Sequence, residues 1–213
     1  MENLVLGSEG FVGQYLCDYL KRKGEGVVRF DIKRSNMEDV RFASLPLKSV
    51  DKVYFLAWDV GGAKYLYRGD NQLHQLKWNM AILQNVMPQL EDSKVPFVFT
   101  SSQLAEDNTV YGVTKKLGEF WTRQIGGCFI RLCNMYGANE EASERSHVVS
   151  DFVNQARDGK IQMLSDGAER RQFIHLEDAC DALHRISNSW ISIKDVADIV
   201  QKVVLEEGIR RMV

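Results

Sequence analysis

The sequence predicts an α/β protein built on a doubly wound parallel sheet. Apolar runs of strand length alternate along the chain with longer stretches of helical period, and strands that alternate with helices form parallel sheets covered on both faces. Three glycines, Gly7, Gly10 and Gly13, end the first apolar run and open the first helical stretch. The alternation and the place of these glycines together predict the fold class.

Each expected element follows from its own pattern. Apolar runs bounded by polar or turn residues predict strands at residues 4–6, 26–30, 53–57, 95–100 and 128–132. Apolar residues at helical spacing predict helices at residues 12–23, 71–90, 113–123 and 148–158. Polar residues dominate 137–146, and a short strand and mixed elements are expected after the last helix. We therefore expect two interleaved parts, with the main sheet in residues 1–136 and a smaller α/β region in 137–213.

Composition and charge narrow the classes of function. The 213 residues are 45% hydrophobic and 26% charged, which is typical of a globular protein with a sizeable core. The net charge is −2 and the longest cluster of Lys and Arg is KRK at 21–23, so no nucleic-acid partner is expected. The apolar runs are only of strand length and the chain starts directly with a strand pattern, so neither a membrane partner nor a signal peptide is expected.

The cysteines and histidines show no spacing typical of a metal site. The four cysteines contain no C-x-x-C pair and are Cys17, Cys128, Cys133 and Cys180. The four histidines are His74, His147, His175 and His184. This usage is typical of reduced thiols, so we expect a cytoplasmic protein that binds no metal.

The glycine spacing G-x-x-G-x-x-G between a buried strand and a helix is typical of a dinucleotide-binding loop of the Rossmann type. Gly7 would permit the tight turn, Gly10 the close approach of a pyrophosphate, and Gly13 the packing of the helix against the strand. The unpaired N–H groups at the helix N-terminus favour phosphate charge. Taken alone, the pattern also fits glycines that only form a turn and bind no ligand.

Asp31 ends the second strand, eighteen residues after Gly13. An acidic residue at this place accepts hydrogen bonds from the ribose hydroxyls of an adenosine and repels a 2′-phosphate. NAD is therefore favoured over NADP as the cofactor, although Lys33 and Arg34 follow closely and act against this preference. The alternative interpretation is that Asp31 only caps the end of the strand.

Tyr111 and Lys115 are four residues apart and share one face of an expected helix. A Lys ammonium beside the phenol, together with a nicotinamide cation, would lower the pKa of the tyrosine and let it exchange protons near neutral pH. Ser101 and Ser102 follow the strand at 95–100 and can hydrogen-bond a hydroxyl or a carbonyl of a substrate.

These motifs, in this order, resemble the extended short-chain dehydrogenase/reductase superfamily, and within it the NAD-dependent nucleotide-sugar epimerase/dehydratase family. Asp31 is one of the residues that match the family. The other matching blocks run over nearly the whole chain and are GSEGFVG (7–13), DKVYFLA (51–57), KWNMAILQNV (77–86), FVFTSS (97–102), YGVTKKLGE (111–119), IRLCNMYG (130–137), RQFIHLEDACDAL (171–183) and ISIKDVADIV (191–200).

The resemblance implies a role for each matching residue. Tyr111 would be the catalytic acid/base, Lys115 its partner that also contacts the nicotinamide ribose, and Ser102 the polarising hydroxyl. With Tyr111 and Lys115, the NAD-binding residues would be Gly7, Gly10, Phe11, Val12, Gly13, Asp31, Asp39, Val40, Leu56 and Ala57. The substrate-binding residues would be Asn79, Asn134 and, as a clamp on the phosphates of a nucleotide sugar, Arg171. Residues 1–136 would then form the NAD-binding domain and 137–213 the nucleotide-sugar-binding region, and the helices at 71–90 and 113–123 would pair in a homodimer.

The implied reaction starts when Tyr111 removes a proton from a sugar hydroxyl, usually at C4, and hydride passes to NAD to leave a keto-sugar. The 4,6-dehydratases of the family carry an Asp–Glu pair after the active-site serine, where this chain has Gln103 and Leu104. The loop LAWDVGGAKYL (56–66) is similar to one in GDP-mannose 3,5-epimerases, but Leu104 stands where they use a cysteine. An epimerase acting through a transient C4 keto-sugar remains, or a C4 dehydrogenase/reductase of a GDP- or UDP-linked sugar.

Other interpretations stay open. A non-catalytic NAD-binding regulator or scaffold predicts loss of the Tyr, Lys or Ser, all of which are present, and a reductase of small carbonyls would not need Arg171. The chain is shorter than most family members between Asp31 and Asp39, between Ser102 and Tyr111, after residue 188 and at the C-terminus.

Several further side chains are expected to be structural. The tryptophans are expected to pack in the core and are Trp58, Trp78, Trp121 and Trp190. Residues 140–144 are expected to form a solvated loop, with contact of Arg145 or His147 to a phosphate as the alternative. Lys64 and Arg68 are expected to be surface charges.

Overall fold

A five-stranded parallel sheet forms the centre of the computed structural model, which describes residues 1–66, 68–137, 140, 145–163, 166–168 and 170–187. The strand order is β2-β1-β3-β4-β5 and every neighbouring pair is parallel. The strands are β1 (Glu2–Leu6), β2 (Gly26–Phe30), β3 (Lys52–Phe55), β4 (Phe97–Ser102) and β5 (Cys128–Leu132). Because the order reverses between β1 and β3, the sheet is doubly wound, and the predicted fold class is confirmed.

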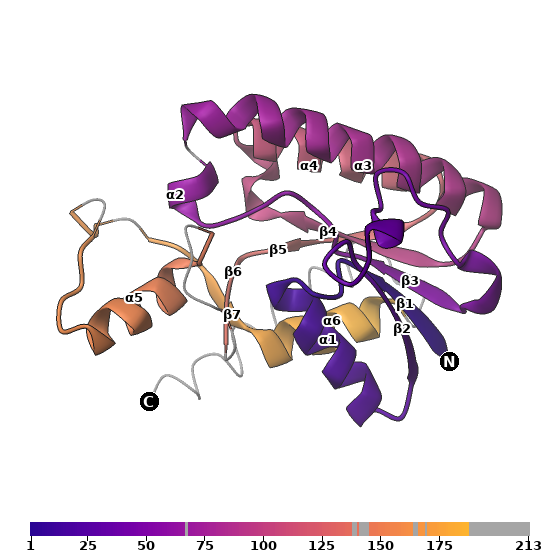
Figure 1. Ribbon diagram of the computed structural model, residues 1–213, viewed down its shortest axis with the longest axis horizontal. Coiled ribbons are helices and arrows are strands. Elements are labelled where there is room, and N and C mark those ends of the chain that lie inside the picture. Colours follow the sequence, from indigo (N-terminus) through magenta and orange to yellow (C-terminus); the bar gives the residue numbers. More distant parts are fainter. Residues whose placement is uncertain (67, 138–139, 141–144, 164–165, 169, 188–213) are drawn as a thin grey trace.

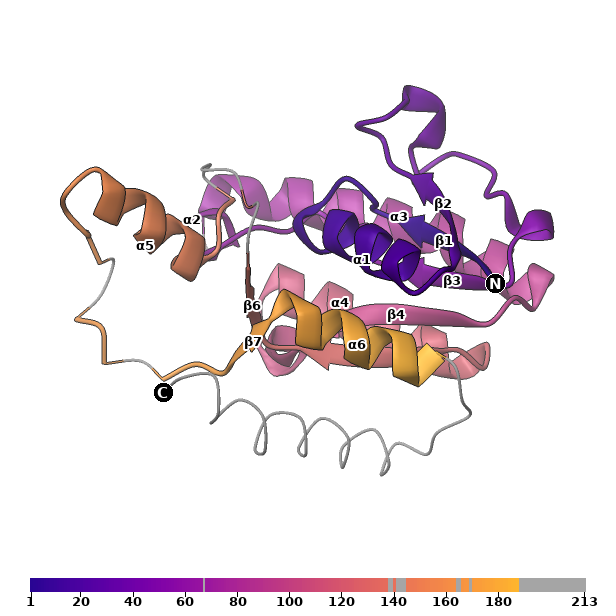
Figure 2. The ribbon, with the colours of Figure 1, turned by 90° about the horizontal axis from the view of Figure 1, so that it is seen from below.

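Helices cover both faces of the sheet (Figures 1 and 2). The helices α3 (Gln72–Ser93) and α4 (Val110–Gln124) pack side by side on one face, and α1 (Phe11–Arg22) and α6 (Leu176–Ser187) pack together on the other. Side chains alternate along β1, so Leu4 and Leu6 join the core under α3 whereas Val5 joins the core under α1 and α6. All three are fully buried, as expected of a sheet without a solvent face.

The structure also contains elements that the sequence pattern did not predict. A second, two-stranded parallel sheet joins β6 (Asn134–Tyr136) to β7 (Phe173–His175). The short helix α2 (Ala63–Leu66) follows β3. The helix α5 (Val148–Arg157), which was predicted at 148–158, lies beyond the small sheet (Figure 1). Single 3-10 turns occur at η1 (Asn36–Glu38), η2 (Leu47–Ser49), η3 (Gly69–Asn71) and η4 (Gln103–Glu106).

Two strands end at other residues than predicted, and both differences concern the site. β3 ends at Phe55 rather than at residue 57, so Leu56 and Ala57 lie in the loop beyond the sheet. β4 continues to Ser102, because Ser101 and Ser102 pair in register with Arg131 and Leu132 of β5. Both serines are therefore held by strand geometry, not by a loop.

The two expected parts of the chain are interleaved. α6 lies in the second part by sequence, yet it completes the helical layer beside α1. Its docking is polar as well as apolar, since Tyr19 Oη donates to Asp181 at 2.8 Å and His184 Nε2 lies 2.7 Å from Glu25. The division of the chain at residue 136 stays a prediction. The block at 191–200 and Trp190 lie outside the described residues.

No helix in the part of the chain that the structure describes is both long and apolar enough to cross a bilayer.

Candidate active site

A cavity of about 1920 Å³ opens at the carboxyl ends of the parallel strands. This volume exceeds the range of about 300–1,000 Å³ typical of a site for one small ligand, so two ligands can share it. The residues predicted from the sequence that line it are Gly7, Gly10, Phe11, Val12, Gly13, Asp31, Asp39, Val40, Leu56, Ala57, Ser102, Tyr111, Lys115, Asn134 and Arg171. The cavity therefore joins the glycine loop to the Ser, Tyr and Lys side chains. Asn79 is not among the lining residues.

The glycine loop leaves no room for side chains where it folds back. Gly7 has a φ of +87°, and a Cβ there would lie 2.7 Å from the backbone nitrogen of Ala57. A Cβ on Gly13 would lie 2.0 Å from the carbonyl oxygen of Gly7. α1 begins at Phe11 with Gly10 as its N-cap, so no capping side chain covers its first N–H groups. A helix N-terminus in this state binds anions, which agrees with the predicted pyrophosphate site.

Asp31 is buried at the end of β2 and accepts two backbone hydrogen bonds. Its Oδ2 accepts from Glu9 N at 2.9 Å and its Oδ1 accepts from Lys33 N at 2.9 Å. The carboxylate thus caps the strand end, and each oxygen keeps capacity for a further donor. The guanidinium of Arg34 lies within 3.6 Å of Glu9 and 3.4 Å of Glu38, so these carboxylates offset its charge. Because Glu9 and Glu38 offset the charge of Arg34, the Asp31 carboxylate favours a ribose without a 2′-phosphate.

Asp39 is engaged by a residue that the sequence reading did not single out. Arg41 Nε donates to Asp39 Oδ1 at 2.9 Å and Arg41 Nη2 donates to Oδ2 at 2.5 Å, and this pairing lowers the pKa of the Asp39 carboxyl. The same guanidinium lies 3.3 Å from the ring centre of Trp78, which also lines the cavity. A direct contact of Asp39 with adenine stays a prediction.

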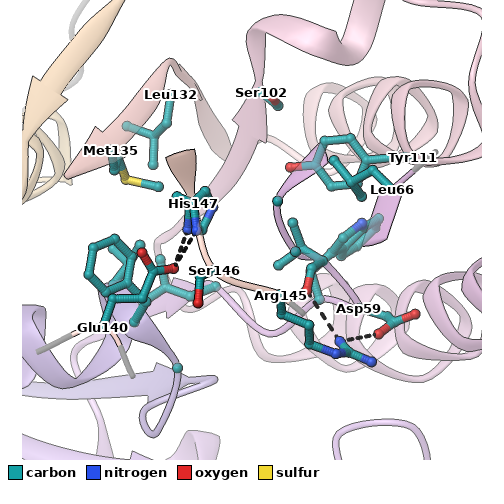
Figure 3. A pocket seen from close by; sticks show the side chains of 18 of the residues that line it. Asp59, Leu66, Ser102, Tyr111, Leu132, Met135, Glu140, Arg145, Ser146 and His147 are labelled. Atoms are coloured by element: carbon teal, nitrogen blue, oxygen red, sulfur yellow. Dashed lines mark hydrogen bonds and ion pairs between the residues drawn. The ribbon is translucent and has the colours of Figure 1, made fainter. Parts of the chain in front are cut away.

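Ser102, Tyr111 and Lys115 meet at the ends of β4 and α4. The helix starts at Val110 because Thr109 Oγ1 accepts from Gly112 N at 3.0 Å and caps it. Tyr111 is 8% exposed and Lys115 is 3% exposed, and Lys115 Nζ donates to the carbonyl of Thr100 at 2.6 Å. Figure 3 shows the Tyr111 side chain reaching into the pocket on the side where Ser102 lies.

In the protein alone, the pKa of Tyr111 is raised. Burial raises the pKa of Tyr111 to about 12, and a hydrogen bond with Ser102 acts in the opposite direction without reversing the shift. Burial also lowers the pKa of Lys115 well below its usual value. The protein alone thus keeps the phenol protonated at neutral pH, because both groups are desolvated and the ammonium lies 5.9 Å from the centre of the phenol ring. A lower pKa needs an additional positive charge in the cavity.

A buried carboxylate, Asp59, organises the opposite wall and was not predicted. Asn79 fixes it from behind, since Asn79 Oδ1 accepts from Asp59 N at 2.8 Å and Asn79 Nδ2 donates to Asp59 O at 3.2 Å. Tyr65 Oη donates to Asp59 Oδ2 at 2.8 Å, and Arg145 Nη1 donates to Oδ1 at 2.7 Å. Asn79 therefore holds this loop from outside the cavity lining, and its contact with substrate stays a prediction.

The double glycine of the loop lets residues 145–147 approach. A Cβ on Gly62 would lie 2.1 Å from the carbonyl oxygen of Ser146, and Gly62 N donates to Arg145 O at 2.8 Å. The Arg145 guanidinium lies 3.9 Å from the ring centre of Tyr65 and next to Asp59 (Figure 3). Arg145 follows the stretch 140–144 that was expected to form a solvated loop, and of that stretch the structure describes only Glu140. The Arg145 side chain connects this segment to the loop after β3.

Three other charged residues have partners in the structure. Glu140 and His147 pair across 2.5 Å between Oε1 and Nδ1, and the His147 ring stacks on Phe11 with ring centres 5.5 Å apart (Figure 3). Lys64, expected to be a surface charge, donates to Asp151 of α5 at 2.9 Å. The Lys64–Asp151 contact joins α2 to α5, and the His147–Phe11 contact joins the residue before α5 to the start of α1.

Asn134 and Arg171 lie on the small sheet and its approach. Asn134 starts β6, and its Nδ2 donates to the carbonyl of Gln172 at 3.1 Å. Arg171 precedes β7 and is exposed at the cavity. Pairing of β6 with β7 thus brings the two predicted substrate contacts to one edge of the cavity.

Comparison with known proteins identifies similar sequences. The model of the NAD dependent epimerase/dehydratase family matches residues 3–192. A UDP-2-acetamido-2,6-beta-L-arabino-hexul-4-ose reductase of Pseudomonas aeruginosa is 27% identical over 201 residues, which cover 90% of this chain and 51% of the relative. GDP-mannose 3,5-epimerase 1 of rice is 21% identical over 253 residues, covering 92% and 67%. The chain spans about half to two thirds of the length of these relatives.

Solved structures share the fold. A UDP-N-acetylglucosamine 4-epimerase from Methanobrevibacter ruminantium superposes with a TM-score of 0.74 at 18% identity, covering 90% of this chain and 74% of that one. The UDP-glucose 4-epimerase of Thermotoga maritima gives a TM-score of 0.69 at 21% identity, covering 86% and 72%. At these identities the likeness concerns the fold.

Proposed function

The chain belongs to the NAD-dependent epimerase/dehydratase family, and from this we propose that it is a nucleotide-sugar epimerase acting through a transient C4 keto-sugar. One observation carries the proposal. A single cavity joins the glycine loop at the start of α1 to Ser102, Tyr111 and Lys115. A cofactor on the loop and a sugar beside Tyr111 would therefore share one enclosed space.

The residues of the glycine loop and of β2 fit NAD. The uncapped start of α1 and the tight packing of Gly7 and Gly13 provide a cradle for a pyrophosphate, and Asp31 provides acceptors for ribose hydroxyls. Lys115 would contact the nicotinamide ribose. When bound, NAD supplies a hydride acceptor and a positive charge.

The chain's own groups would handle the proton and hold the sugar. Tyr111 would take the proton of the C4 hydroxyl at its Oη and return it to the same oxygen when the ketone is reduced again. Inversion at C4 would follow if the keto-sugar presents its opposite face when the hydride returns to C4. Ser102 would donate a hydrogen bond to the same sugar oxygen, and the Lys115 ammonium would stabilise the phenolate. Arg171 would bind the phosphates of the nucleotide sugar and Asn134 would bind beside it.

A C4 reductase is the second candidate. The Pseudomonas relative is named as a reductase of a 4-keto sugar nucleotide, and no separate acid/base pair follows Ser102, where Gln103 and Leu104 stand. Reduction and C4 epimerisation need the same three side chains. They differ in whether the hydride returns to the molecule it came from.

The experiment that separates these readings is product analysis on a panel of UDP-, GDP-, dTDP- and CDP-linked sugars with NAD present. A product of unchanged mass with inverted C4 means epimerase. Loss of two hydrogens with net formation of NADH means C4 dehydrogenase, and consumption of NADH on a 4-keto-sugar means reductase. No conversion of any sugar by protein that binds NAD would contradict the proposal and favour a non-catalytic role.

The outer face of α3 and α4 supports the predicted homodimer. Val113, Leu117 and Phe120 line one side of α4, and Phe120 is 59% exposed. Leu73 on the adjacent α3 is also exposed. Apolar side chains on two neighbouring helices match the surface needed for a four-helix interface between two copies.

Phe120→Glu is therefore expected to convert a dimer into a monomer, because it places a charge at the centre of that apolar face. We expect the dissociation constant measured by analytical ultracentrifugation to rise at least about 100-fold, as for loss of an interface hot spot. Phe42→Glu is the matched control, because Phe42 is 74% exposed outside these helices. A monomeric wild-type protein, or a Phe120→Glu protein that stays dimeric, would contradict the proposed interface.

A further inference from the structure

Trp58 lies between the core and the predicted catalytic side chains. It follows β3 by three residues, lines the cavity and packs on Phe55 and Phe99, with ring centres 6.3 and 5.4 Å away. The expectation of core packing is thus met on one side of the indole. On the other side, Lys115 Nζ lies 4.1 Å from the centre of the Trp58 ring.

The Lys115 ammonium has few polar neighbours for a group so deeply buried. Its Nζ donates to the Thr100 carbonyl, and an ammonium has two further N–H groups. Aromatic faces cover it instead, since the centre of the Phe99 ring lies 4.8 Å away in addition to the Trp58 ring. A cation over the face of a desolvated indole is attracted by the ring quadrupole.

The nearest buried carboxylate is largely committed to other partners. Glu119 lies one turn after Lys115 on α4 and is 1% exposed. Its carboxylate accepts from Arg131 Nε at 2.6 Å and from Ser101 Oγ at 2.6 Å. The titratable groups found to act on or lie near Lys115 are Glu119 and Tyr111, both on α4. Arg131 on β5 pairs with Glu119 and with Glu106 on η4, and Glu106 also pairs with Lys116. Because Arg131 offsets Glu119, the indole face is an important remaining attraction for the ammonium.

Trp58 also packs against the cluster that contains Tyr111, the second predicted catalytic side chain. The other members of this cluster are Tyr65 and Leu66. We propose that Trp58 is a positioning residue that keeps the Lys115 ammonium charged and in place beside Tyr111. This inference rests on the proposed function, in which Lys115 stabilises the Tyr111 phenolate.

Removal of the Trp58 indole is expected to lower the pKa of Lys115. Burial already lowers the pKa of Lys115, so loss of the cation–π contact lowers it further and leaves more neutral amine at neutral pH. A neutral amine does not stabilise the phenolate, so the pKa of Tyr111 rises. The rising limb of the pH–rate profile then moves to higher pH.

The test measures Lys115 directly, by NMR titration of protein labelled with ¹³C at the lysine Cε, with the signal assigned by its loss in Lys115→Met. We expect Trp58→Met to lower the pKa of Lys115 by about one unit, a tenfold change in its protonation equilibrium, and Trp58→Phe to lower it less. Trp121→Met is the matched control, because Trp121 lies on α4 but packs against the core under α3. An unchanged or raised pKa in Trp58→Met would overturn the inference.

The pH–rate profile of turnover distinguishes failure of the inference from failure of the proposed function. A Lys115 shift with a matching shift of the rising limb supports both. Turnover by the wild-type protein without a Lys115 shift in Trp58→Met overturns only the role of Trp58. A Lys115 shift in a protein that converts no nucleotide sugar overturns the catalytic role of Trp58 together with the proposed function, while the cation–π contact stands.

Discussion

Tyr111→Phe is expected to lower kcat by about a thousandfold or more while NAD affinity changes less than about twofold. The substitution removes the hydroxyl that would carry the proton, and general acid–base catalysis by one side chain contributes about 10²–10⁴-fold. The ring that packs against Tyr65 and Leu66 stays in place, so the fold and the cofactor site are retained. Steady-state kinetics and an NAD titration on the same preparations measure the two effects.

The matched control removes a phenol from the same cluster. Tyr65 Oη donates to Asp59 and accepts from Arg145 at 2.8 Å, but it carries no proton in the proposed reaction. Tyr65→Phe is therefore expected to lower kcat less than about tenfold, the scale of one lost hydrogen bond. Equal losses in both variants would mean that the Tyr111 hydroxyl contributes no more than one hydrogen bond and would contradict its role as acid/base.

Gly13→Ala is expected to destabilise the protein by about 3 kcal/mol and to weaken NAD binding more than about tenfold. Its Cβ would lie 2.0 Å from the Gly7 carbonyl oxygen, which is backbone and cannot rotate away. Gly7 is itself fixed, because its N–H donates to Phe30 O at 2.9 Å. α1 must then move away from the sheet, and overpacking of this kind costs about 1–3 kcal/mol.

Urea unfolding and NAD titration measure both consequences. Gly69→Ala is the control, since a Cβ there meets no atom within 4 Å and Gly69 has an ordinary φ. If Gly13→Ala matched Gly69→Ala in stability and in NAD affinity, the close packing of α1 on the glycine loop would not be what forms the cofactor site.

Much of the fold could be predicted because its signals are local. The apolar runs of β2 and β5 have the predicted bounds, and the order of strands and helices dictates a parallel sheet. The glycine loop could be predicted because its spacing reflects close backbone packing, which the Cβ distances at Gly7 and Gly13 explain. That Ser102, Tyr111 and Lys115 lie close together could also be predicted. Ser102 ends a strand and the other two residues lie near the start of a helix, and strand ends and helix starts meet at one edge of a parallel sheet.

The opposite wall of the cavity could not be predicted, because its contacts are not local. Arg145 reaches Asp59 across 86 residues of sequence, and neither residue belongs to a periodic pattern. The sequence shows Gly61 and Gly62 next to each other, but it does not show that the backbone of Ser146 packs against Gly62. The small sheet was missed for the same reason, since β6 and β7 have three residues each.

The pKa of Tyr111 depends on burial, which the spacing of Tyr111 and Lys115 in the sequence does not predict. Four residues of separation on a helix place Lys115 on the same face as Tyr111, but they do not reveal that both are buried or that the ammonium bonds to Thr100. Burial governs both groups, and it raises the pKa of the phenol to about 12. The cation supplied by a bound cofactor thus becomes part of the proposed chemistry.

The proposed hydride transfer is tested most directly by the reduced nicotinamide it must form. NAD-loaded protein is mixed rapidly with each of the UDP-, GDP-, dTDP- and CDP-linked sugars while the absorbance of the reduced cofactor is followed. We expect at least one nucleotide sugar to produce a rise on the wild-type protein and none on Tyr111→Phe. An equal rise on both proteins would contradict the assignment. So would the absence of both a rise with every sugar on NAD-loaded protein and a fall when NADH-loaded protein is mixed with a 4-keto-sugar.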